Sequence, residues 1–256
     1  MSHADSPADG EQSFMSHLFE LRARLLKAVA AVLAILVVLT PFANRLYGWL
    51  AKPLLEHLPA GGAMIATDVA SPFFAPLKLA FFAAVFLAMP FILYQAWSFV
   101  SPGLYRHERR LALPLLASAV TLFYVGCAFA YYLVLPAIFT FMTSVAPEGV
   151  AVMPDISRFL DFALILFLAF GFCFEVPVAL VILVAIGAVT PEQLVRSRPY
   201  TIVGAFVIAA ILTPPDVISQ LLLAIPMCIL YEVGIIAARV VARRPARGDT
   251  GVAGEN

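Results

Sequence analysis

Three acidic side chains lie where an acid is unexpected, and they are the residues of this sequence best suited to chemistry. Glu175 is the single ionisable residue in the apolar stretch between residues 162 and 191. Glu20 and Glu108 each lie among arginines, in the segments HLFELR and YRHERR. A carboxylate in such a place can grip a guanidinium through two parallel hydrogen bonds, or it can take up a proton.

Each of these acids also has a purely structural interpretation. Placing a carboxylate in mid-membrane costs about 2.5–3.5 kcal/mol on insertion scales, so a protonated Glu175 bonded to a neighbouring helix is one alternative. The nearby Pro177 frees a backbone carbonyl and keeps that site polar. Glu20 and Glu108 can equally balance the adjacent arginines, because exposed ion pairs contribute little.

Motifs for covalent or metal chemistry are missing from the sequence. It has no Gly-rich phosphate loop ending in Lys-Ser or Lys-Thr, no HExxH and no GxSxG. The three cysteines, Cys127, Cys173 and Cys228, lie in apolar stretches without metal-ligand spacing, and the histidines are scattered. We therefore expect no enzyme activity, no metal and no cofactor.

Composition places the chain in a membrane. Hydrophobic residues make up 62% of it and charged residues 12%, and the mean hydropathy is +0.97. Soluble domains carry about 25% charged residues, and a chain of this length cannot hide so much apolar surface from water. The expected fold class is an all-α integral membrane protein whose proline-kinked helices form a concave wall.

The apolar stretches predict six transmembrane helices, at about residues 24–42, 73–97, 111–135, 158–187, 200–213 and 216–238. They form one domain, 14–239, between a polar tail at 1–13 and a disordered tail at 240–256. The start of the chain lacks the pattern of a cleavable signal peptide, so the first apolar stretch should remain as a span. The fifth stretch reaches only about 21 Å. Two short spans are preferred for the last pair over a re-entrant hairpin.

Basic residues predict the orientation of these spans. Twelve of the sixteen lysines and arginines fall on the side of both termini, and Arg45, Lys52, Lys78 and Arg158 fall on the other. This bias places both termini in the cytoplasm. On the outer side, Leu46, Trp49, Leu50 and Leu54 recur near helical spacing and predict a short amphipathic helix along the membrane surface. Pro136 is expected to end or bend the third span.

Several long segments resemble the TatC family of twin-arginine protein export. They run in the family's order from about residue 14 to 239: HLFELR at 17–22, MIATDVASPFF at 64–74, SPGLYRHERR at 101–110, AFGFCFEVP at 169–177, RPY at 198–200 and TPPD at 213–216.

The resemblance implies a receptor in the bacterial inner membrane, with both termini cytoplasmic, that exports folded proteins. Such a receptor binds signal peptides carrying two consecutive arginines, assembles with TatB and TatA subunits, and uses the proton-motive force. By resemblance, four residues match the signal-peptide site: Glu20, Phe99, Leu104 and Glu108. Glu175 and Gln220 match polar positions that face partner helices, and Pro53 and Asp216 match functional positions of less defined role.

Two other functions fit parts of the pattern. A proton-coupled transporter of small molecules would use Glu175 as its proton site, but it predicts internal repeats and paired broken helices, which the sequence lacks. A passive membrane scaffold fits the composition equally well. Binding of a twin-arginine signal separates the receptor from both.

Overall fold

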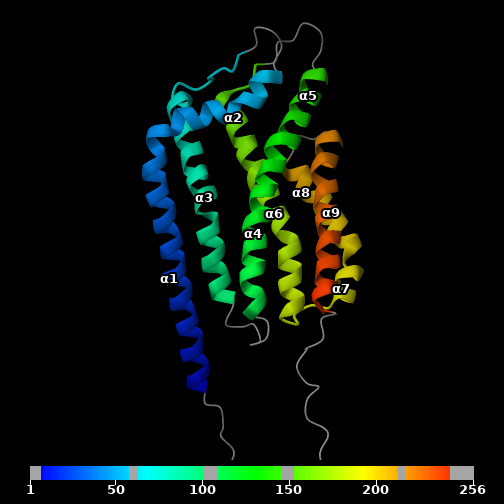
Figure 1. Cartoon of the computed structure of the whole chain (residues 1–256). Helices are drawn as coiled ribbons and strands as arrows, with labels where there is room; N and C mark the ends of the chain where they lie inside the picture. The colour runs from blue at the N-terminus through cyan, green and yellow to red at the C-terminus, as the bar shows by residue number, and fades with distance from the viewer. Residues whose placement is uncertain (1–6, 58–62, 101–108, 146–152, 213–216, 243–256) are drawn as a thin grey trace, which may run out of the picture.

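The protein is a row of long helices with one helix laid across an end (Figure 1). The computed structural model describes residues 7–57, 63–100, 109–145, 153–212 and 217–242. Their elements are α1 (Pro7–Leu39), the short turn η1 (Thr40–Phe42), α2 (Ala43–His57), α3 (Ser71–Val100), α4 (Arg109–Phe129), the π-helical turn η3 (Ala130–Val134), α5 (Leu135–Val145), α6 (Ile156–Ala185), α7 (Pro191–Arg196), α8 (Arg198–Leu212) and α9 (Val217–Ala242).

The predicted all-α membrane fold is confirmed across these ranges. Five segments are long and apolar enough to cross a membrane: residues 18–52, 71–99, 113–145, 156–185 and 217–242. The fifth expected span, which is not among these segments, is α8, an apolar helix of 15 residues that reaches about 22 Å. α9, expected to be short like α8, has 26 residues and spans a bilayer by itself.

The helices run beyond the predicted spans at several ends. α1 begins at Pro7, inside the stretch expected to be a polar tail. The third span does not end at Pro136, because α4, η3 and α5 continue one another to Val145. The wider π-turn comes just before Pro136, where a regular turn would meet the proline ring. The backbone thus absorbs the proline instead of stopping at it.

The two ends of the row differ in character. α1 begins and α9 ends at the same end of the molecule, which we call the terminal end (Figure 1). The opposite end, the α2 end, carries α2 across the tops of the upright helices. α2 is the amphipathic helix that the sequence predicts: its Leu50 is buried, while Trp49 is 78% exposed.

α6 is the central helix of the row. It packs against α4, α9 and α3, whereas α1 packs against α3 and α8 against α9. The main core lies along α6, where Leu160, Leu166 and Phe170 are fully buried. Aromatic contacts such as Phe129 with Phe170 add to this core.

Glycines let α6 approach its neighbours closely. A Cβ added at Gly126 of α4 would lie 2.5 Å from the carbonyl oxygen of Phe170, and one added at Gly234 of α9 would lie 2.9 Å from the Cα of Pro177. Both obstacles are backbone atoms that cannot swing away. Small residues at such crossings are the usual route to tight helix packing in lipid.

A polar joint closes the α2 end between two segments far apart in the sequence. Asp155 caps α6 by accepting hydrogen bonds from the amides of Ser157 and Arg158. Its other oxygen accepts bonds from the hydroxyl and the amide of Thr67, at 2.7 and 2.9 Å. These bonds, led by the Thr67 hydroxyl, hold the pKa of Asp155 well below its usual range.

A Gly126→Ala substitution is expected to destabilise the protein, because the new methyl group forces α4 and α6 apart. Overpacking of this kind costs about 1–3 kcal/mol, so the unfolding temperature in detergent should fall. The matched control is Gly204→Ala on α8, where an added Cβ meets nothing within 4 Å. The control should unfold at the wild-type temperature or slightly above it, and equal losses in both variants would contradict the proposed close contact.

Candidate functional site

Glu20 forms a small polar network where α1 meets α3. Arg24, one turn later on α1, places its Nη2 at 2.5 Å and its Nε at 3.0 Å from Oε1 of Glu20. The Nη1 of Arg24 also lies 3.4 Å from Oε1 of Gln95 on α3. Glu20 therefore already holds a guanidinium, gripped through two nitrogens on one oxygen.

This network is partly open to solvent. The Glu20 side chain is 38% exposed and that of Arg24 is 21% exposed, while Gln95 is buried. Water weakens an ion pair at this exposure, so the pair contributes little to stability. A carboxylate with such a weakly held partner can exchange it for a guanidinium from another molecule at small cost.

Phe99 lies close to this network on α3. It follows Gln95 by four residues, so the two side chains share one face of the helix, and Phe99 is half-buried. On α1, Phe19 is exposed next to Glu20. The structure thus places two of the four predicted signal-peptide residues on the helices of the α1–α3 joint, Glu20 one turn from Arg24 and Phe99 one turn from Gln95. The other two, Leu104 and Glu108, lie outside the described residues.

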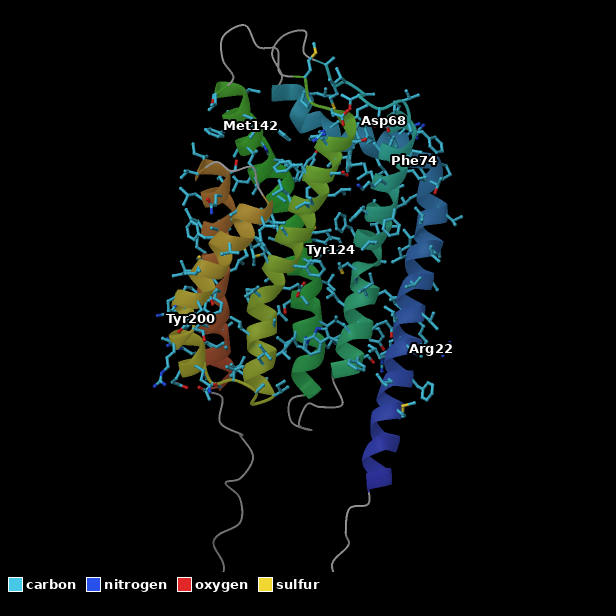
Figure 2. All side chains as sticks on the ribbon, turned by 180° about the vertical axis from the view of Figure 1, so that it is seen from behind. Arg22, Asp68, Phe74, Tyr124, Met142 and Tyr200 are labelled. Carbon is cyan, nitrogen blue, oxygen red and sulfur yellow. The ribbon has the colours of Figure 1, made fainter. Side chains whose placement is uncertain are left out.

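The terminal end of the molecule carries several exposed arginines. Arg22 is exposed on α1, toward the same end of the molecule as Tyr200 at the start of α8 (Figure 2). Arg196 in the last turn of α7 and Arg239 in the last turn of α9 also lie at the terminal end, but on the other side of the row from α1 (Figure 1). Of these three arginines, Arg22 is therefore the one close to the α1–α3 joint.

Glu175 lies about two thirds of the way along α6, away from the Glu20 network. Its Oε1 is buried, and it finds no hydrogen-bond partner within the described part of the chain. Two residues later, Pro177 stands inside the helix and cannot donate to the carbonyl of Cys173. The described residues therefore do not supply the helix-to-helix bond that a purely structural role of Glu175 would need.

The remaining predicted residues are only partly described. Gln220 of α9 donates from its Nε2 to the carbonyl oxygen of Phe206 on α8, at 3.1 Å. It therefore joins the short helix to the last one. Pro53 lies within α2, but its side chain is not described, and Asp216 lies outside the described residues.

The structure adds polar residues that the sequence did not single out. One of them is Gln95. The sequence feature that could have indicated it is a single amide side chain in an otherwise apolar span, one helical turn before Phe99. Lys78 of α3 and Asp161 of α6 form an ion pair at 2.5 Å near the α2 end. Arg198 and Glu232 form another at 2.7 Å between α8 and α9. Most of these charged residues can be noted in the sequence, but the sequence does not indicate which of them form ion pairs with one another.

Metal chemistry has no support in the described ranges. No group of three or more His, Cys, Asp or Glu side chains there comes together as a metal site would require. What the described polar groups offer is recognition of a charged ligand by hydrogen bonds.

Comparison with known proteins gives one consistent family. The family model described as Sec-independent protein translocase protein (TatC) matches residues 16–226. A relative of that name from Azotobacter chroococcum is 54% identical over 244 residues, covering 94% of this chain and 96% of its own length. The Escherichia coli K12 relative is 54% identical over 228 residues, covering 89% and 88%.

One relative is matched over a smaller share of its own length, and one solved structure has the same fold as this chain. The Halothiobacillus neapolitanus relative is 55% identical over 90% of this chain, which spans 63% of that relative's length. A crystal structure described as the twin arginine translocase receptor TatC has a TM-score of 0.79 and 38% identity, covering 89% of this chain and all of the crystallised one. The protein therefore belongs to the TatC family of Sec-independent protein translocase proteins.

Proposed function

We propose that this chain is the receptor subunit of a twin-arginine translocase in the bacterial inner membrane. It binds signal peptides with two consecutive arginines at its cytoplasmic terminal end. It then organises TatB and TatA partner subunits, and the proton-motive force drives the folded cargo across. The observation that carries this proposal is the Glu20 carboxylate, which accepts a guanidinium at the joint between α1 and α3.

The chemistry of this joint fits an arginine ligand. The Arg24 guanidinium meets Glu20 in the way that a peptide arginine would, through charge-assisted hydrogen bonds. Such bonds contribute about 1.5–3 kcal/mol each, and less at an exposed site. In this mechanism the peptide arginine displaces Arg24, whose Nη1 remains near Gln95. Lysine lacks the planar fork, so the site favours arginine.

Apolar side chains beside the acid fit the rest of a signal peptide. A signal sequence has a cationic segment followed by an apolar one. Phe19 is 61% exposed next to Glu20, and Phe99 is half-buried on the adjoining face of α3. These rings would receive the apolar segment. Leu104 and Glu108, which lie outside the described residues, remain part of the proposed site by resemblance alone.

Glu175 suits contact with a partner subunit inside the membrane. A buried oxygen without a hydrogen-bond partner is costly in lipid. A polar group on a partner helix would remove that cost, which gives the partner a defined position along α6. Gln220, at the crossing of α8 and α9, would support a second contact there.

The orientation follows from charge. Arg22, Arg196 and Arg239 lie at the terminal end, whereas Lys52, Lys78 and Arg158 lie toward the α2 end. Positive residues accumulate on the cytoplasmic side, which supports both termini inside. The family match does not favour the alternative of a proton-coupled transporter.

Replacing Glu20 by Gln is expected to weaken binding of a twin-arginine signal peptide about tenfold, because the amide cannot form a charge-assisted pair. Binding is measured by photocrosslinking of a labelled peptide to the complete receptor complex. Glu192→Gln on α7, an exposed acid at the same end, is the control and should bind as wild type does.

A second substitution separates recognition from stability. Arg24→Gln removes the internal partner but keeps the Glu20 carboxylate, so it should retain or strengthen peptide binding. If Arg24→Gln and Glu20→Gln lose binding equally, the ion pair merely holds α1 against α3, and Glu20 is not the recognising group.

Replacing Glu175 by Ala should reduce disulfide or photocrosslinking to a partner transmembrane helix at that depth, with peptide binding unchanged. Glu175→Gln, which keeps hydrogen-bonding capacity, should retain more of the crosslink. The control is Thr121→Ala, at an exposed position of α4 whose hydroxyl bonds its own helix. Wild-type crosslinking in Glu175→Ala would assign this residue a purely structural role.

The proposed orientation predicts which sites a membrane-impermeant thiol reagent reaches in intact cells. In a background with the three native cysteines replaced, Val69→Cys, at a residue that is 99% exposed, should be labelled from outside. Glu192→Cys should be labelled only after the membrane is opened. The reverse pattern would place the Glu20 network outside the cell and rule out signal-peptide recognition there.

A further inference from the structure

A cavity of about 620 Å³ lies under α2, apart from the Glu20 network and from the proposed partner contacts. α2, α3, α6 and the continuous run of α4, η3 and α5 all contribute to its walls. Its size is that of an ordinary ligand pocket, about 300–1,000 Å³. Its depth follows from α3, where the lining residues run from Leu79 to Phe86. That distance is two helical turns, or about 10 Å.

The walls change in character along this depth. Phe86, Cys127 and Phe167 line the deep part, where the surroundings are apolar. Lys52 and Trp49 line it from α2, which lies across the end of the row (Figure 1). None of the described residues that line the cavity carries a carboxylate. Lys52 also makes an interaction within the chain, and an anionic head would share its ammonium group with that partner. A cavity that is apolar at depth and has a lysine at its mouth matches a molecule with an anionic head and a hydrocarbon tail.

Two tyrosines at the π-turn shape the mouth. η3 places Tyr131 and Tyr132 in succession along the cavity wall, and the hydroxyl of Tyr131 donates to the carbonyl oxygen of Trp49 at 3.0 Å. That bond holds α2 over the cavity. Tyr132 is 76% exposed, as is much of Trp49; aromatic rings with a polar atom favour the level of lipid headgroups.

We propose that this cavity holds one acyl chain of a phospholipid between α3 and η3, while the phosphate lies at Lys52 and the second acyl chain stays outside the cavity. The lysine stem can lie along apolar surface while its ammonium group meets the phosphate. The Trp49 and Tyr132 rings flank the glycerol region. The bound lipid fills the space between α2 and the helices beneath it. It thereby fixes the position of α2 relative to α3 and η3.

A transmembrane helix fits this cavity less well than a lipid. A helix is about 10–12 Å across, which is much wider than a single hydrocarbon chain. An acyl chain is thin and long, and it follows a narrow space about two turns deep. The proposal requires only that the chain spans a bilayer, so its failure and the failure of signal recognition are separate results.

The test uses the complete chain, purified in mild detergent, depleted of lipid and titrated with phosphatidylglycerol while native mass spectrometry counts bound lipids. Ala83→Phe fills the cavity from α3 and should abolish the tightest lipid adduct. Lys52→Gln should weaken it about tenfold and remove the preference for phosphatidylglycerol over diacylglycerol, which has the tail without the phosphate.

Matched controls keep the outcomes distinct. Arg158→Gln removes an exposed charge near the same end, and Ala117→Phe adds a ring at an exposed position of α4; neither residue lines the cavity. Both should bind lipid as wild type does, and all variants should still bind a twin-arginine peptide, which shows that they are folded. Equal lipid retention in Ala83→Phe and wild type would mean that only surrounding bilayer lipids bind. Protection of an Ala83→Cys thiol by a partner transmembrane peptide, and not by lipid, would also overturn the proposal.

Discussion

The backbone-to-backbone approach of α6 to its two neighbours is the constraint on which the rest of the molecule depends. Lipid is as apolar as leucine, so burial alone does not drive transmembrane helices together, and close packing must do so. Gly126 and Gly234 permit that packing because a Cβ at either position would meet backbone atoms of α6. With α4 and α9 fixed on α6, the remaining helices attach outward: α3 to α6, α1 to α3 and α8 to α9.

The two ends of this assembly are held by different kinds of contact. At the α2 end, Asp155 joins the start of α6 to Thr67 through several hydrogen bonds, and the amide of Ile156 donates to the carbonyl oxygen of Ile65 at 2.9 Å. At the terminal end, the described polar link between α1 and α3 is the partly exposed network of Glu20, Arg24 and Gln95. The terminal end is also held by the buried bond from the Tyr231 hydroxyl to the Leu194 carbonyl oxygen, so the partly exposed contact that suits an exchangeable ligand is the α1–α3 network.

In the proposed function the molecule separates three tasks along one row of helices. We propose charge recognition at the α1–α3 joint, where the side chains of Glu20 and Arg24 are partly exposed. The deep carboxyl of Glu175 belongs to the central helix, where an unsatisfied oxygen has the greatest effect on a neighbouring helix. The cavity beneath α2 is the proposed lipid site. The strength of each electrostatic interaction depends on its local dielectric constant, which is higher at the partly exposed α1–α3 joint than inside the row of helices.

The sequence by itself determined the membrane class, the order of the spans and the three unusual acids, because apolar length and isolated charge are local properties. It also predicted α2 from the spacing of Leu46, Trp49 and Leu50. It missed the helix that continues through Pro136, because the π-turn that accommodates the proline depends on how α4 and α5 pack. Only the tertiary structure paired Lys78 with Asp161, brought Gln95 to Arg24 and placed Lys52 over an apolar cavity. Those contacts join residues that lie far apart in the chain, and their partners are chosen by helix packing rather than by any pattern within one helix.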